Sequence, residues 1–116
     1  MKEDNVRNAC RINVMAVHDA MDILGGKWIV SIVASLCYHN SRRFSEILVD
    51  VNGISNKMLS KELKELEVNK IIKRTVLDTQ PITVRYELTE YGRTLKPVVE
   101  TLIKWGINHR KEMFGK

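Results

Sequence analysis

The apolar positions of the first third of the chain recur at helical spacing. They lie three or four residues apart and predict a first helix, which we expect to end at Gly25-Gly26, where the backbone is permissive. Residues 1–13 are mostly polar and are expected to be flexible. A second helix, from about Lys27 to Tyr38, is apolar over much of its circumference and predicts the central core helix. The positions that define the first helix are Val14, Val17, Met21 and Leu24.

Two helix starts follow in quick succession. Ser45 can cap a short helix, with Phe44 before it and Val49 within it as a hydrophobic staple. The dipeptide Asn52-Gly53 predicts a tight turn. A short helix, a turn and a second helix predict a helix-turn-helix. Ser55 is placed to cap the second helix, and Ile54 and Leu59 form a second hydrophobic staple there.

After Lys70 the period of the apolar positions changes from helical to alternating. The segments 71–78 and 83–88 predict two strands, the second with an apolar residue at every other position. Pro81 lies between them, where a residue that cannot donate to a strand ladder fits the tip of a hairpin. A hairpin directly after a helix-turn-helix is a wing.

The last part of the chain is helical again. Thr89 is placed to cap this segment, and Pro97 within it predicts a kink or a break. The elements together predict a single α+β domain, mainly α, over residues 1–116, of the winged helix-turn-helix class. A domain of this size cannot bury the apolar stripes of its first and last helices at once, so we expect a partner chain to cover them. The candidate interface residues are Val14, Val17, Met21, Val99, Leu102, Ile103 and Trp105.

The helix from Ser55 carries a stripe of like charge. Lys57, Lys61 and Lys64 lie opposite its leucines at i, i+4 and i+7, and like charges at i, i+4 cost an isolated helix about 0.2–0.5 kcal/mol. One interpretation is a solvated face on which Lys61 pairs with Glu65 and Lys64 pairs with a second nearby carboxylate, Glu67. The other is contact with DNA phosphates, where released counterions offset the repulsion.

Composition and charge narrow the classes of partner. The net charge of +5 and the pI of about 9.4 favour an acidic partner, of which double-stranded DNA is one and an anionic membrane surface another. The longest apolar run is too short to span a bilayer, and the first residues lack the apolar segment of a secretory signal. We therefore expect a cytoplasmic protein with no membrane partner.

No pattern in the chain points to catalysis or to a bound group. His18, His39 and His109 share no metal-ligand spacing, and no Ser/His/Asp order or glycine-rich phosphate loop stands out. Cys10 and Cys37 form no CxxC pair, so we expect reduced thiols. The sequence therefore predicts a protein that is not an enzyme, with no catalytic residue, no metal site and no cofactor.

Several sequence motifs occur in order along the chain. They are ILGGKW at 23–28, RRFSEI at 42–47, GISNKMLSKELKELE at 53–67, VRYELTEYGRTLKPV at 84–98 and WG at 105–106. With these motifs, the chain resembles the HxlR-type winged helix-turn-helix transcriptional regulators of bacteria, relatives of the MarR group. The resemblance runs from about Met15 to Gly106, which is most of the chain.

The resemblance implies a DNA-binding homodimer, and we expect a repressor of a palindromic operator. It places the helix of residues 55–69 in the major groove and the hairpin of residues 72–88 along the adjacent backbone, with the first and last helices in the subunit interface. Polar side chains at the start of the helix are expected to read bases, and basic or wing-tip residues to contact the backbone. The DNA-binding candidates are Arg42, Arg43, Ser55, Asn56, Lys57, Ser60, Lys61, Lys64, Thr79, Gln80 and Thr83.

Two alternatives stay open. One is a winged-helix module that binds proteins, which would show no salt-dependent duplex binding. The other is a thiol-based sensor with an oxidant or small-molecule effector, since the resemblance implies a cysteine ten residues before Gly25. That position is Met15 here, and Cys10 lies five residues earlier, so Cys10 is the candidate redox residue.

Overall fold

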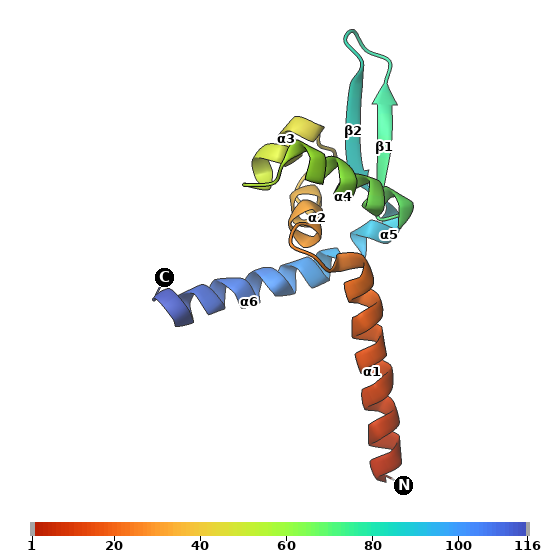
Figure 1. The fold of residues 1–116 in the computed structure, drawn as a ribbon, viewed down its shortest axis with the longest axis vertical. Helices are drawn as coiled ribbons and strands as arrows, with labels where there is room; N and C mark the ends of the chain where they lie inside the picture. Colours follow the sequence, from red (N-terminus) through yellow and green to blue (C-terminus); the bar gives the residue numbers. More distant parts are fainter. Residues whose placement is uncertain (1, 116) are drawn as a thin grey trace.

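A computed structural model describes residues 2–115, which form six helices and a two-stranded antiparallel sheet (Figure 1). A small body carries the helix-turn-helix, the hairpin projects from one end of it, and the first and last helices extend away from it in different directions (Figure 1). The elements are α1 Lys2–Leu24, α2 Ile29–Cys37, α3 Phe44–Asp50, α4 Asn56–Val68, β1 Ile72–Leu77, β2 Thr83–Leu88, α5 Glu90–Arg93 and α6 Lys96–Phe114.

The core is built around α2, as its nearly all-apolar circumference predicted. Ile32 and Val33 are completely buried, and α2 contacts α3, β2 and α6. Every other element that reaches the core contributes one or a few large apolar side chains to the same cluster. Within residues 2–115 no single helix has the length and hydropathy needed to cross a bilayer. Only α1 and α2 counted together meet these two criteria, and the chain bends by 80° between them.

The turn and the start of α4 confirm the predicted helix-turn-helix. The Ser55 Oγ accepts the backbone N–H of Met58 at 3.1 Å, and the predicted staple residues Ile54 and Leu59 are both buried. Gly53 has a φ of +94°, a backbone conformation that residues other than glycine rarely adopt. This turn therefore sets the angle between α3 and α4.

The start of α3 differs from the prediction. The helix begins at Phe44, and Glu46 Oε1 accepts the backbone N–H of Arg43 at 2.8 Å. Ser45, the predicted cap, lies inside the helix and is exposed, and Val49 is 79% exposed and forms no staple. A carboxylate that reaches back to the preceding N–H satisfies the helix start two residues earlier than a serine cap would.

The wing has the predicted strands. β1 and β2 pair in antiparallel register from Ile72 opposite Leu88 to Leu77 opposite Thr83. The first pair is buried at the base of the wing, whereas the tip is exposed to solvent. The hairpin is therefore anchored at one end and projects beyond α4 at the other (Figure 1).

α1 is longer than predicted. It begins at Lys2, so residues 2–13, which we expected to be flexible, form its first half. Val6 and Cys10 continue the apolar stripe toward the N-terminus, and Glu3 in the first turn complements the positive end of the helix dipole. The helical periodicity of this segment did not stand out in the sequence, because residues 1–13 are mostly polar.

The C-terminal segment breaks where Pro97 predicted. Thr89 Oγ1 accepts the N–H of Gly92 at 2.9 Å and so caps α5, and Pro97 lies in the first turn of α6. Val99 is buried against the body, which corrects its assignment to a subunit interface, and Ile103 is half-buried there. The two residues share one face of α6, so the helix needs that face for its own attachment.

The apolar stripes of α1 and α6 lie largely outside the core. Within residues 2–115, Leu24 is the one buried residue of α1 and Val99 the one of α6. Val17 is 60% exposed and Trp105 is 67% exposed. The radius of gyration is 17.4 Å, whereas a compact domain of this length has about 13 Å. Most of the difference comes from these two helices, which a monomer leaves uncovered.

Candidate nucleic-acid interface

The lysine stripe of α4 faces solvent. Leu59, Leu63 and Leu66 of the opposite stripe are buried in the core, so the helix cannot turn its lysines inward. All three lysines are exposed, and none forms an ion pair with a carboxylate in residues 2–115. The surface pairs with Glu65 and Glu67 that a merely solvated face would favour are not formed, so the three ammonium groups have no close carboxylate partner in residues 2–115.

The N-terminus of α4 presents polar side chains beside these lysines. Asn56 and Ser60 are exposed, and the Ser55 hydroxyl, although it caps the helix, still has its own proton to donate. No acidic residue lies in the first turn, so the positive end of the helix dipole is open to an anion. These features together suit a helix that approaches a phosphate backbone with its N-terminal half.

The predicted wing-tip residues have different roles. Thr79 Oγ1 donates to the Pro81 carbonyl at 2.6 Å and lies 2.9 Å from the Thr83 hydroxyl, so the two threonines build the turn itself. Gln80 is exposed, and no hydrogen bond to another residue of the described chain engages its side chain. Of the three, Gln80 is therefore the side chain best placed to reach a ligand.

The lower part of the wing is internally paired. Lys73 Nζ lies 3.1 Å from Glu87 Oε1, directly across the ladder, and Arg85 donates to Ser41 Oγ at 3.4 Å. Both contacts tie basic side chains to the hairpin or to the loop before α3. Two of the basic side chains of the lower wing therefore have partners within the chain.

Arg42, one of the expected DNA contacts, is engaged within the chain. Its Nε and Nη2 donate to Asp50 Oδ2 at 3.1 and 2.6 Å, and its Nη1 donates to Glu46 Oε2 at 3.4 Å. These contacts use three of the five N–H donors of the guanidinium and hold the side chain against α3, which leaves two N–H groups for any other partner. The neighbouring Arg43 is exposed and stays among the expected DNA contacts.

The Arg42 junction connects three elements. The backbone N–H groups of Arg42 and Tyr86 each donate to the other's carbonyl at 2.8 Å, which joins the loop before α3 to β2 of the wing. Asp50, at the end of α3, also accepts from Ser35 Oγ of α2 at 2.7 Å. The wing, α3 and α2 are therefore joined through Arg42 and Asp50, which contact each other. Arg42, Glu46 and Asp50 are four residues apart, which is the signal in the sequence that could have revealed the junction.

The carboxylates of the junction are stabilised in their charged form. Hydrogen bonds from Ser35 and then from Arg42 lower the pKa of Asp50, and the backbone N–H of Arg43 lowers the pKa of Glu46. A carboxylate with a lowered pKa stabilises the folded state above its unfolded pKa. That contribution is lost as the pH falls through the folded pKa.

The two cysteines differ in environment. Cys10 is exposed on α1, beside a shallow hollow lined by Val6, Val14 and Val17. Cys37 is half-buried at the end of α2, and burial raises the pKa of its thiol. Cys10 is therefore the more accessible thiol. In residues 2–115 no three His, Cys, Asp or Glu side chains are grouped as a metal site requires.

The comparison with protein families decides the identity of this arrangement. The chain matches the family described as HxlR-like helix-turn-helix over residues 23–114. The chain belongs to the HxlR-like family. The matched region contains α2 to α6, and with them the lysine stripe, the wing and the Arg42 junction. The HxlR-type resemblance and the winged helix-turn-helix fold are thereby confirmed.

Similar proteins extend this result. The chain is 38% identical over 101 residues to YtcD of Bacillus subtilis (strain 168), an uncharacterized HTH-type transcriptional regulator, covering 87% of this chain and 79% of YtcD. Among solved structures, the reduced form of the redox regulator HypR has a TM-score of 0.79 at 34% identity, covering 87% of this chain and 99% of that one. Diamide-treated YodB from B. subtilis has a TM-score of 0.66 at 37% identity, covering 84% and 90%. This HxlR-like chain is a DNA-binding transcriptional regulator.

Exchanging Arg42 for Gln tests the junction. The variant should unfold with a free energy lower by about 1–2 kcal/mol at pH 7, because charge-assisted hydrogen bonds to partly exposed carboxylates are lost. Urea denaturation measures the change, with Arg43→Gln as the matched control that should shift it by less than about 0.5 kcal/mol. The difference between Arg42→Gln and the wild type should shrink as the pH falls through the lowered pKa values of Asp50 and Glu46, because protonated carboxyl groups no longer form the charged pairs. Equal stability of both variants at pH 7 would contradict the junction.

Proposed function

We propose that this regulator binds a palindromic operator as a homodimer, with α4 of each subunit in a major groove and the β1–β2 hairpin on the adjacent backbone. The outward-facing, unpaired lysine stripe of α4 is the observation that carries the proposal. Two-fold symmetry would place the half-sites one helical turn apart, about 34–36 Å. The resemblance favours repression, and the site of action is the cytoplasm, where bacterial DNA lies.

The contacts divide by chemistry. Lys57, Lys61 and Lys64 contact phosphates, where each releases condensed counterions, and Arg43 adds a cation just before α3. Asn can pair with adenine and Lys with guanine in the major groove. The base-reading candidates are therefore the first exposed polar residues of α4 and its cap, and Gln80, with the threonines that shape the tip, contacts the backbone. The base-reading set is Ser55, Asn56, Lys57, Ser60 and Lys61.

The subunit interface is formed by the uncovered sides of α1 and α6. The uncovered side of α1 carries Val14, Val17 and Met21, and that of α6 carries Leu102 and Trp105. Each of these side chains is about half exposed or more in the single chain. Burying apolar surface gains about 25 cal/mol per Å², so a second copy stabilises these helices where the body cannot. Large aromatic residues such as Trp105 are frequent anchors of such interfaces.

The response to salt tests DNA binding. Operator affinity should fall steeply with ionic strength, and the slope of log K against log salt should decrease by about 1 in Lys61→Ala, because one phosphate contact is lost. Lys104→Ala, an exposed lysine on α6, should leave the slope unchanged. Binding measured by fluorescence anisotropy that stays weak at low salt for every duplex would favour a protein-binding module.

The oligomeric state tests the interface. Leu102→Glu places a charge in the proposed contact and should convert the dimer to a monomer in analytical ultracentrifugation. Val49→Glu is the matched control, since Val49 is also an exposed apolar residue but lies on α3. A wild-type chain that sediments as a monomer at every concentration, or a Leu102→Glu variant that stays dimeric, contradicts this interface.

A thiol response at Cys10 is a second candidate, favoured by the exposure of Cys10 within the apolar stripe of α1. Oxidation there adds polar atoms to a surface that the dimer buries, and should weaken operator binding. Treatment with hydrogen peroxide, which converts the Cys10 thiol to a sulfenic acid and is itself reduced to water, should therefore lower the affinity of the wild type and spare Cys10→Ser. An identical response of Cys37→Ser and Cys10→Ser would remove Cys10 from this role.

A further inference from the structure

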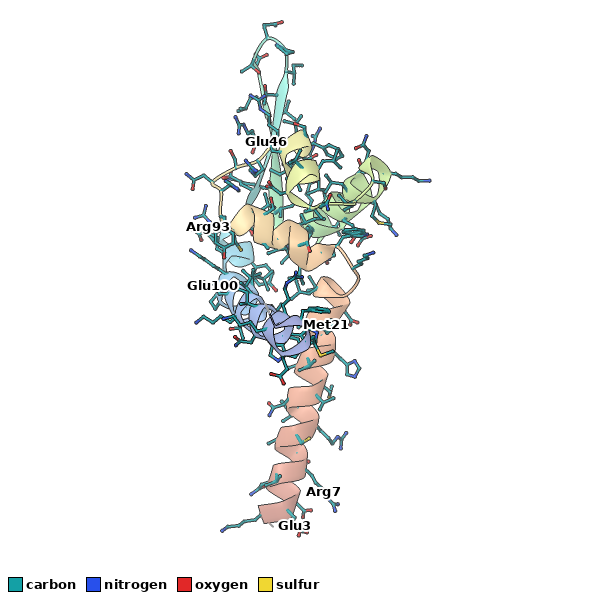
Figure 2. The ribbon with its side chains drawn as sticks, turned by 90° about the vertical axis from the view of Figure 1, so that its left-hand side faces the viewer. Glu3, Arg7, Met21, Glu46, Arg93 and Glu100 are labelled. Atoms are coloured by element: carbon teal, nitrogen blue, oxygen red, sulfur yellow. The ribbon has the colours of Figure 1, made fainter. Side chains whose placement is uncertain are left out.

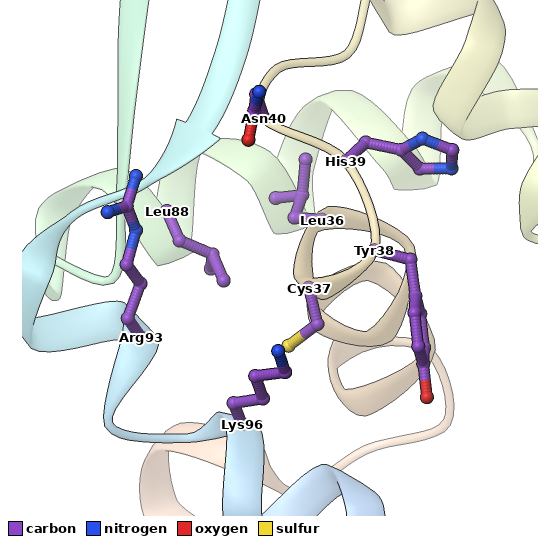
Figure 3. A pocket seen from close by; sticks show the side chains of 8 residues that line it. All are labelled: Leu36, Cys37, Tyr38, His39, Asn40, Leu88, Arg93 and Lys96. Carbon is purple, nitrogen blue, oxygen red and sulfur yellow. The ribbon is translucent and has the colours of Figure 1, made fainter.

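A cavity of about 270 Å³ lies where the body meets α6 (Figure 3). The end of α2 and the base of β2 form one wall, and α5 with the start of α6 forms the other. Leu36 and Leu88 provide a buried apolar floor, while the side chains of Arg93 and Lys96 stand at the opposite wall and Asn40 at the rim (Figure 3). The volume suits a ligand smaller than a typical drug molecule.

The cavity is cationic. Arg93 and Lys96 both line it, neither forms an ion pair in the described chain, and no carboxylate is among the lining residues. Glu100, one turn further along α6, is the nearby acid, and it acts on the Cys37 thiol together with Lys96. α6 has 19 residues and no acid in its first turn, so the positive end of its dipole adds to the two side chains. A lysine at that position is unfavourable until an anion is present.

The Cys37 thiol at the cavity leaves these cations uncompensated. Burial raises the pKa of Cys37, so the group is a neutral thiol at neutral pH and contributes no negative charge beside Lys96. A neutral thiol is also a poor nucleophile. A ligand in the cavity is therefore held reversibly, in contrast to the thiol response considered for Cys10.

The cavity does not belong to the DNA-binding surface. Figure 2 shows Arg93 on one side of the body and α4 on the other, so the same duplex cannot reach both. An anion other than DNA could therefore contact the two cations. The apolar floor distinguishes an organic anion from an inorganic one, because phosphate or sulfate gains nothing from contact with leucine side chains.

We propose that this cavity binds a small organic anion, with its carboxylate on Arg93 and Lys96 and its apolar part on Leu36 and Leu88. The ligand bridges the body and α6, and so holds α6 at one angle. The regulatory consequence rests on the proposed function: if α6 forms the dimer contact, its angle sets the distance between the two α4 helices. The ligand then changes operator affinity to the extent that it binds one angle more tightly.

Hexanoate is a suitable probe, with hexanamide as its neutral counterpart and inorganic phosphate as the anion without an apolar part. Two-dimensional ¹H–¹⁵N NMR of the full chain should show saturable shifts at Asn40, Arg93 and Lys96 with hexanoate. Arg93→Gln and Lys96→Gln should each weaken the binding at least about tenfold, because a charge-assisted hydrogen bond is lost. Lys104→Gln, on α6 but away from the cavity, should bind hexanoate as the wild type does. The same spectra report whether each variant is folded.

Three results overturn the proposal. Hexanamide that binds as tightly as hexanoate would show that the cations play no part. Phosphate that binds as tightly would show that the apolar floor plays none. Absence of shifts at the cavity with every probe would exclude the anion site altogether. Operator binding is measured separately, with and without hexanoate: a chain that binds no operator refutes the proposed function and leaves the NMR result standing.

Discussion

The burial of three leucines on α4 is the constraint on which the rest of the structure depends. Burying a leucine side chain is worth about 1.5–3 kcal/mol, whereas each like-charge pair on the opposite stripe costs about 0.2–0.5 kcal/mol. Because Leu59, Leu63 and Leu66 are buried, the hydrophobic term dominates and fixes the rotation of the helix. The lysines are then forced outward as a consequence. Folding and the proposed contact with DNA therefore use opposite faces of the same helix without conflict.

The Arg42 junction fixes the position of the wing relative to the helix-turn-helix. The wing is a two-stranded hairpin, which is marginal by itself, and it gains a third backbone partner from the loop that contains Arg42. The same residue holds Asp50 at the end of α3, just before the turn into α4. The orientation of the wing and that of the helix-turn-helix are therefore coupled through one residue, by its backbone on the wing side and by its side chain on the α3 side. Two adjacent arginines thus serve different ends, one structural and one exposed.

The outstretched helices explain how so small a body can support a regulator. α6 uses one face, with Val99 and Ile103, to attach to the body, and leaves the next face, with Leu102 and Trp105, uncovered. This division makes the attachment point of α6 a place where the body and the proposed dimer contact meet. The cationic cavity lies at that point. A ligand there and a subunit on the outer face would act on the same helix.

The elements, the turn, the wing and the lysine stripe were determined by the sequence itself. Ser55, Thr89, Gly53 and Pro97 act on neighbours within a few residues, so their effects can be read along the chain. Only the tertiary structure decided the roles of Arg42, Val99 and the cavity. The periodicity of the apolar positions also did not predict that α1 extends to Lys2. Whether a side chain meets a carboxylate, the core or solvent depends on residues brought together by packing, and a local pattern does not encode those distances.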